Sequence, residues 1–196
     1  MRDRVVVLGV FVADTTYRAE RLPVLGETLL GSAFVLGPGG KGSNQAVAAA
    51  RAGANTHFIG KLGQDQFADM ALKTWADAGV QPAVQQSADS FTGAACIFVE
   101  EHSGNNAIIV CPGVAETLSA DDVDASQDLI AGAAVFMTQL EQPMPAALRG
   151  LEIARAGGAT TVLNPAPAAP LPEGILALCD YITPNETCLL YTSPSP

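Results

Sequence analysis

Residues 35–52 read VLGPGGKGSNQAVAAARA, which joins an apolar strand-like run to an alanine-rich helix through four closely spaced glycines. Glycine permits positive φ angles and lets another group approach the main chain closely. The first turn of the following helix exposes free N–H groups and the positive end of the helix dipole. Lys41 adds a charge to this turn, and Asn44 adds an amide that can both donate and accept hydrogen bonds. The stretch therefore predicts a binding site for a polar or anionic ligand.

Two nucleotide-binding patterns can be compared with this stretch. The spacing G-x-G-x-x-G over residues 37–42 fits the dinucleotide fingerprint, but these glycines follow the second apolar segment instead of the first strand. Asp65 is the only carboxylate near the offset that a dehydrogenase requires. The Walker A pattern fails because Val35 occupies the place of its first glycine and Gly42 follows Lys41. A strand-to-helix turn without any ligand is the simplest alternative.

The composition narrows the class of protein. The 196 residues carry a formal charge of −10, which disfavours nucleic acid and anionic membranes as partners. A hydrophobic content of 48% with 15% charged residues is typical of a globular domain with one sizeable core. The four cysteines are scattered without a Cys-x-x-Cys pair, and no signal-peptide or membrane-spanning pattern occurs. We therefore expect reduced thiols and a cytoplasmic location.

The order of the segments predicts an α/β fold. The apolar run Val5–Ala13 predicts a buried strand that ends at Asp14. Residues 15–36 mix polar and apolar side chains and predict short, half-exposed strands outside the main sheet, and residues 93–111 predict a β-hairpin. From residue 119 helices and strands alternate, which builds a parallel sheet with helices on both faces.

Polar residues follow several of the predicted strands. They are Asp14, Glu141, Asn164 and the pair Asn185-Glu186. Each could simply terminate its strand. Ligands of open parallel sheets, however, bind in the crevice beyond the carboxyl ends of the strands. Carboxylates and amides at this edge, beside the glycine loop, suit a polyol, because they exchange hydrogen bonds with hydroxyl groups.

The longer window from Gly39 to Ala46, followed by Gly53 and Gly63, closely resembles the first signature of the PfkB carbohydrate kinases, and among them the ribokinase-like enzymes. The runs NPAPA at 164–168 and ITPNET at 182–187 resemble the same enzymes. The resemblance covers residues 5–187. It implies a three-layer α/β/α domain over 1–187 with a mostly parallel sheet. It also implies a small β lid from about 15–36 and 93–111, which covers the sugar and often forms a homodimer contact.

The resemblance also supplies roles for individual residues. The sugar-binding positions correspond to Asp14, Gly39, Gly40, Lys41, Asn44 and Glu141. Asn185 begins an element that orders the phosphates of ATP and Mg²⁺. The implied reaction is transfer of the γ-phosphoryl group of ATP to a sugar hydroxyl. A nucleoside kinase of the same superfamily and a non-catalytic sugar-binding or dimerisation fragment are the alternatives.

The chain departs from this family in two places. Val12 stands where the ribokinase-like enzymes usually have an asparagine, which puts ribose itself in doubt as the substrate. Cys188 replaces an expected glutamate, and residues 188–196 are uncharged and end in two prolines within three residues. We expect a chain truncated at its carboxyl end with a foreign or out-of-frame tail at 188–196. The Gly-Ala-Gly-Asp segment that supplies the catalytic aspartate is missing, so we expect no metal or catalytic residue in this chain and no turnover.

Overall fold

The computed structural model describes residues 3–186 and 188–189. Its larger sheet, sheet A, has the strand order β10-β9-β8-β1-β4-β5, and every neighbouring pair is parallel. The strands of sheet A are β1 (Arg4–Leu8), β4 (Asn55–Leu62), β5 (Gln81–Gln86), β8 (Val135–Thr138), β9 (Thr160–Leu163) and β10 (Tyr181–Ile182). The helices are α1 (Lys41–Arg51), α2 (Gln66–Ala78), α3 (Ala120–Asp124), α4 (Gln127–Ala131) and α5 (Met144–Gly157), with short 3₁₀ turns at Val114–Thr117 and Ile175–Leu178.

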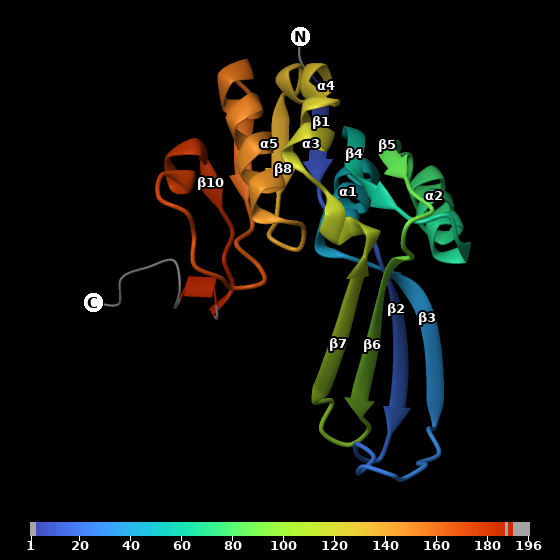
Figure 1. The fold of residues 1–196 in the computed structure, drawn as a ribbon. Coiled ribbons are helices and arrows are strands. Elements are labelled where there is room, and N and C mark those ends of the chain that lie inside the picture. Colours follow the sequence, from blue (N-terminus) through green and yellow to red (C-terminus); the bar gives the residue numbers. More distant parts are fainter. Residues whose placement is uncertain (1–2, 187, 190–196) are drawn as a thin grey trace.

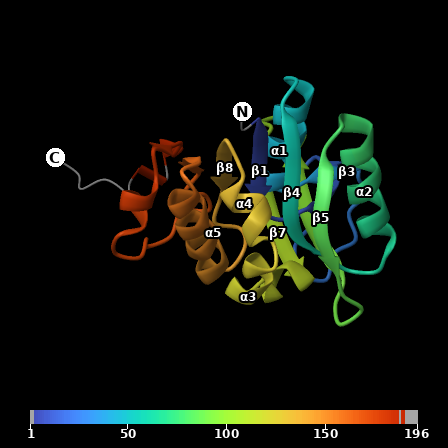
Figure 2. The same ribbon diagram turned by 90° about the horizontal axis from the view of Figure 1, so that it is seen from above.

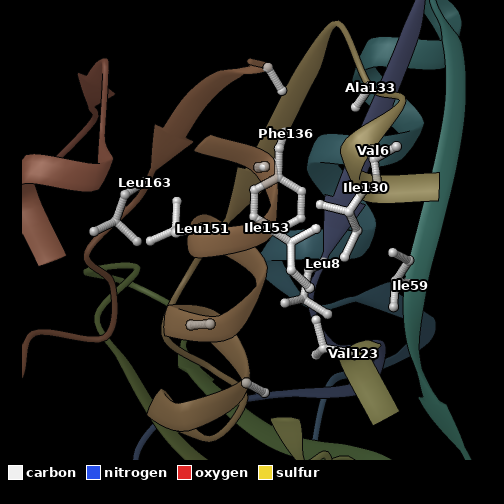
Figure 3. Packing of buried hydrophobic residues seen from close by; sticks show 14 of the residues in the cluster. Val6, Leu8, Ile59, Val123, Ile130, Ala133, Phe136, Leu151, Ile153 and Leu163 are labelled. Carbon is white, nitrogen blue, oxygen red and sulfur yellow. The ribbon is translucent and has the colours of Figure 1, made fainter. Parts of the chain in front are cut away.

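The core of the domain is divided by sheet A into two layers. Side chains alternate across a strand, so Val7 packs with Phe58 and Trp75 on the side of α1 and α2. Val6 and Leu8 point to the other side, where they meet residues of α3, α4 and α5. Figure 3 shows this second cluster, and Figure 2 views the layers from above. The predicted three-layer α/β/α fold is therefore confirmed.

A second, mixed sheet, sheet B, extends away from this body as a long four-stranded ribbon (Figure 1). It consists of β3 (Ala33–Gly39), β2 (Val12–Ala19), β6 (Thr92–Glu100) and β7 (Asn106–Gly113), in that order. β2 and β6 are parallel, and the two outer pairs are antiparallel. The predicted hairpin around residues 101–105 and the half-exposed strands after residue 15 lie in this sheet.

Two expectations about individual strands were wrong. The apolar run Val5–Ala13 is not one strand, because the chain leaves sheet A after Leu8 and enters sheet B at Val12. Asp14 consequently lies within β2 and does not end the first strand of sheet A. The edge strand β5 was not predicted, since its sequence QPAVQQ is largely polar.

No helix among the described residues is both long and apolar enough to cross a membrane. The predicted domain end at Thr187 and residues 190–196 of the predicted tail lie outside the part of the chain that the structure describes. Cys188 is described and buried.

Candidate sugar-binding site

The glycine bend brings the end of β3 against β2 just before α1 begins. Gly40 has φ 90° and immediately precedes α1. A Cβ atom on Gly40 would collide with the carbonyl oxygen of Val10, and a Cβ atom on Gly39 would collide with the carboxylate of Asp14. Glycine is therefore required here both for the backbone angle and for the close approach of Asp14.

The start of α1 binds a carboxylate that comes from far along the chain. The backbone N–H of Lys41 donates to Oε2 of Glu141 at 2.7 Å, and the Lys41 ammonium donates to Oε1 at 2.7 Å. Glu141 reaches this position because it follows the end of β8, the neighbour of β1 in sheet A. We predicted a polar or anionic ligand at this helix start. In the structure, the carboxylate of Glu141 from the same chain occupies part of this position. A carboxylate has about four acceptor positions, so Glu141 retains capacity for hydroxyl donors.

Asp14 lies beside this ion pair. Its Cα partners across the sheet are Gly37 on β3 and Ala95 on β6, both small residues. Partial burial raises the pKa of Asp14 above its usual range, the charge of Glu141 raises it further, and Lys41 lowers it. The three charged groups are therefore close enough to influence one another, with a net charge of −1.

A hollow of about 320 Å³ adjoins the Lys41–Glu141 pair. Small-molecule sites begin at roughly this size, near 300 Å³. The remaining lining residues are all apolar, and they come from the link between β1 and β2, from β2, from β7 and from the segments after β8 and β9. They are Val10, Val12, Val110, Pro112, Leu140 and Pro167. The site thus has one charged edge and one apolar wall.

A buried glutamine supports the loop from behind. Gln139 is fully buried, and its Nε2 donates to Oε1 of Gln45 on α1 at 2.5 Å. Its Oε1 lies 2.6 Å and 2.7 Å from the places where Cβ atoms on Gly9 and Gly42 would sit. The glutamine therefore fills the space that these two glycines leave between the β1–β2 crossing and the first turn of α1. We did not predict a role for Gln139 from the sequence. What distinguishes this glutamine is that its polar side chain is buried at a junction between a strand and a helix, which is seen only in the structure.

The remaining predicted residues are less closely associated with this cluster. Asn44 is exposed on the first turn of α1, where its N–H donates to the carbonyl oxygen of Gly40 at 2.9 Å. Asn164 follows β9, and its buried Oδ1 has no hydrogen-bond partner among the described residues. Asn185 follows β10, two strands away from β8, and its Oδ1 accepts from the N–H of Cys188 at 2.8 Å. The structure therefore gathers Asp14, Gly39, Gly40, Lys41 and Glu141, and leaves Asn185 apart from them.

Among residues 3–186 and 188–189, no three His, Cys, Asp or Glu side chains gather as metal ligands would. Glu141 lines the hollow and is already paired with Lys41, and Asp14 is close enough to both for their charges to shift its pKa. The described residues beside the hollow therefore offer acceptors for hydroxyl groups, without the set of oxygen ligands that would hold Mg²⁺ by themselves.

The chain is similar to known proteins in sequence and in fold. The family model described as pfkB family carbohydrate kinase matches residues 2–190. The ribokinase of Staphylococcus aureus is 43% identical over 95% of this chain. A solved structure named Sa239 superposes with a TM-score of 0.91 at 40% identity over the whole chain. The structure of Arabidopsis thaliana ribokinase complexed with ribose and ATP gives a TM-score of 0.84 at 30% identity over 96% of the chain.

The chain spans about three fifths of the length of these proteins, namely 62%, 65% and 62% of them in the same order. The family model nevertheless matches nearly all of the residues present, and the solved neighbours share both sheets of the fold. The chain therefore belongs to the pfkB family of carbohydrate kinases.

Proposed function

We propose that the whole protein transfers a phosphoryl group from ATP to a sugar hydroxyl, and that these 196 residues carry its sugar-binding half. The observation that carries the proposal is the cluster of Asp14, Lys41 and Glu141 beside one hollow at the carboxyl edge of sheet A. Ligands of such sheets bind in this crevice. The proposal is further supported by the names of the related ribokinases.

The charges at the site favour a neutral polyol over an anion. Asp14 and Glu141 offer acceptors for hydroxyl groups, and a hydrogen bond to a charged group contributes roughly 1.5–3 kcal/mol. Lys41 fixes the position of Glu141 and offsets one of the two negative charges. Because the cluster keeps a net negative charge, it repels phosphate groups at this end of the site. This argues against a pyrophosphate bound on the glycine loop, which the dinucleotide reading of residues 37–42 requires.

We further propose that ATP, with Mg²⁺ on its phosphates, binds farther along the sheet edge toward Asn185. The bound ATP supplies the phosphoryl group, whose transfer depends on positioning and charge neutralisation. The residues of this chain hold and orient the accepting hydroxyl. A base for its proton is expected from a Gly-Ala-Gly-Asp segment, which does not occur in this sequence. We therefore expect these 196 residues to bind sugar without turnover.

Isothermal titration calorimetry of the chain with a panel of pentoses, hexoses and adenosine tests the proposal. We expect one class of sugar to bind, and Glu141→Gln to weaken that binding by about tenfold or more, since the charge-assisted bonds are lost. Lys73→Met is the matched control, because Lys73 forms an ion pair of the same length, 2.7 Å, with Asp77 on the exposed side of α2.

Tight binding of adenosine would favour a nucleoside kinase, whose base the apolar wall could also accommodate. Binding of no compound in the panel would contradict the proposal. ATP-dependent phosphorylation by the purified chain would contradict the expected lack of turnover.

We also propose that two copies of the chain associate through the outer face of sheet B, which is the face opposite to Asp14. Tyr17 and Phe34 contact each other there with tilted rings whose centroids are 5.1 Å apart, and both rings are exposed, as is Ile109 on β7. By their register these side chains lie on the face opposite to Asp14. Sedimentation velocity should give a dimer that Phe34→Glu converts to a monomer, whereas a monomeric native chain would refute this assignment.

A further inference from the structure

We infer that the hollow takes a deoxy sugar, and that Val12 sets this preference. The inference rests on the proposed function, that is, on sugar binding beside Asp14 and Glu141. It concerns the opposite edge of the same hollow, where the chain offers apolar side chains.

Val12 and Asp14 present opposite chemistry on the same face of β2. They are two residues apart, so their side chains point to the same side of sheet B and start roughly 6–7 Å apart along the strand. That separation is comparable to the width of a pentose ring with its substituents. A sugar whose hydroxyl donates to Asp14 therefore places its neighbouring edge against Val12.

The Val12 side chain is held at this wall by close packing. It is 5% exposed and packs in a small cluster with Val10, Ala95 and Ala115. Val110 and Pro112 continue the wall on β7, and Leu140 and Pro167 close it from the sheet A side. Valine, leucine and proline side chains neither donate nor accept hydrogen bonds.

A sugar hydroxyl directed at this wall would lose its bonds to water without replacement. A buried hydroxyl without a partner is unfavourable, whereas a C–H group at the same place gains apolar contact. Apolar pockets reject an added hydroxyl only moderately, by up to about a hundredfold. We therefore expect the preferred monodeoxy pentose to bind about ten- to a hundredfold more tightly than the parent pentose.

Calorimetric titration of the native chain with D-ribose, 2-deoxy-D-ribose and 3-deoxy-D-ribose tests this inference. One deoxy sugar should bind at least tenfold more tightly than D-ribose, and Val12→Asn should remove or reverse that preference, because its amide can pair with the hydroxyl. Val35→Asn is the matched control. Val35 lies on the same face of sheet B, is 58% exposed and is outside the lining of the hollow, so its replacement should change nothing.

The outcomes separate the inference from the function on which it rests. D-Ribose binding as tightly as both deoxy sugars would overturn the inference and leave sugar binding intact. No binding of any of the three, nor of other sugars, would overturn both. A deoxy preference that persists in folded Val12→Asn would overturn the role of Val12. Should that variant fail to fold, Val12→Thr adds a hydroxyl at nearly constant volume, and the comparison of sugars on the native chain stands by itself.

Discussion

Replacing Asp14 by asparagine should weaken sugar binding while leaving the fold intact or slightly more stable. The variant keeps the shape of the side chain and one acceptor oxygen, but it loses the charge. A hydrogen bond to a charged group contributes roughly 1.5–3 kcal/mol. Removing most of that contribution corresponds to a loss of affinity of roughly ten- to a hundredfold. The loss should appear in calorimetric titrations at pH 7 with whichever sugar the native chain prefers.

The stability of the same variant should move in the other direction. Partial burial, followed by the charge of Glu141, raises the pKa of Asp14, so the folded chain binds this proton more tightly than the unfolded chain does. Above the raised pKa the ionised carboxylate therefore lowers stability, and below the ordinary value the penalty disappears. Asp14→Asn removes the penalty at pH 7. Because the group is only partly buried, we expect a gain of at most about 1 kcal/mol.

Urea unfolding gives the stability readout, since the single tryptophan, Trp75, is fully buried and its emission shifts on exposure. Asp77→Asn serves as the control, because Asp77 lies in an exposed ion pair on α2, and far less of its side chain is buried than of the Asp14 side chain. Unchanged sugar affinity in Asp14→Asn would remove Asp14 from the site. A loss of more than about 1 kcal/mol of stability at pH 7 would refute the electrostatic reasoning.

Three further predictions follow from the same contacts. Gly39→Ala should abolish sugar binding and destabilise the chain, because its Cβ would enter the Asp14 carboxylate. Gly37→Ala on the same strand should be tolerated, because its Cβ meets no described heavy atom within 4 Å. Thermal melts and sugar titrations compare the two variants, and equal behaviour would show that the reasoning is wrong. Sugar affinity should fall as the pH drops through the raised pKa of Asp14, and a profile that stays flat from pH 7 down to the ordinary pKa of an aspartate would contradict this. Trp75→Phe should lower stability by about 1 kcal/mol or more, since the buried hydroxyl of Ser43 loses its indole donor at 3.0 Å. Because the variant has no tryptophan, its urea unfolding is followed by far-UV circular dichroism, and no change would show that this bond is dispensable.

Local chemistry was sufficient to predict the bend and the helix that follows it. The glycines at 39 and 40 require close approach and positive φ, and α1 begins at Lys41 as the sequence indicates. The spacing S-x-x-D over residues 119–122 is also a local capping pattern, and in the structure Ser119 and Asp122 form a complete capping box at the start of α3. These features depend on residues that are neighbours in the chain, so the sequence alone specifies them.

The contacts that complete the site are non-local and could not be predicted from local patterns. Lys41 and Glu141 are 100 residues apart, and their pairing depends on β8 lying beside β1. The departure of the chain from sheet A at Gly9 was missed because the residues on both sides are equally apolar. The part played by Gln139 emerges only when Gly9 and Gly42 are seen to leave room for it.

The central claim is that the glycine bend, Asp14 and Glu141 form one sugar site in this chain. It is tested most directly by following backbone amide chemical shifts during titration with the pentose that binds best. We predict that the amides of Gly39, Gly40, Lys41 and Glu141 shift together with one common dissociation constant, and that those around the hollow at Arg155 and Asp180 do not. Shifts confined to Arg155 and Asp180, or different dissociation constants for the bend and for Glu141, would contradict it.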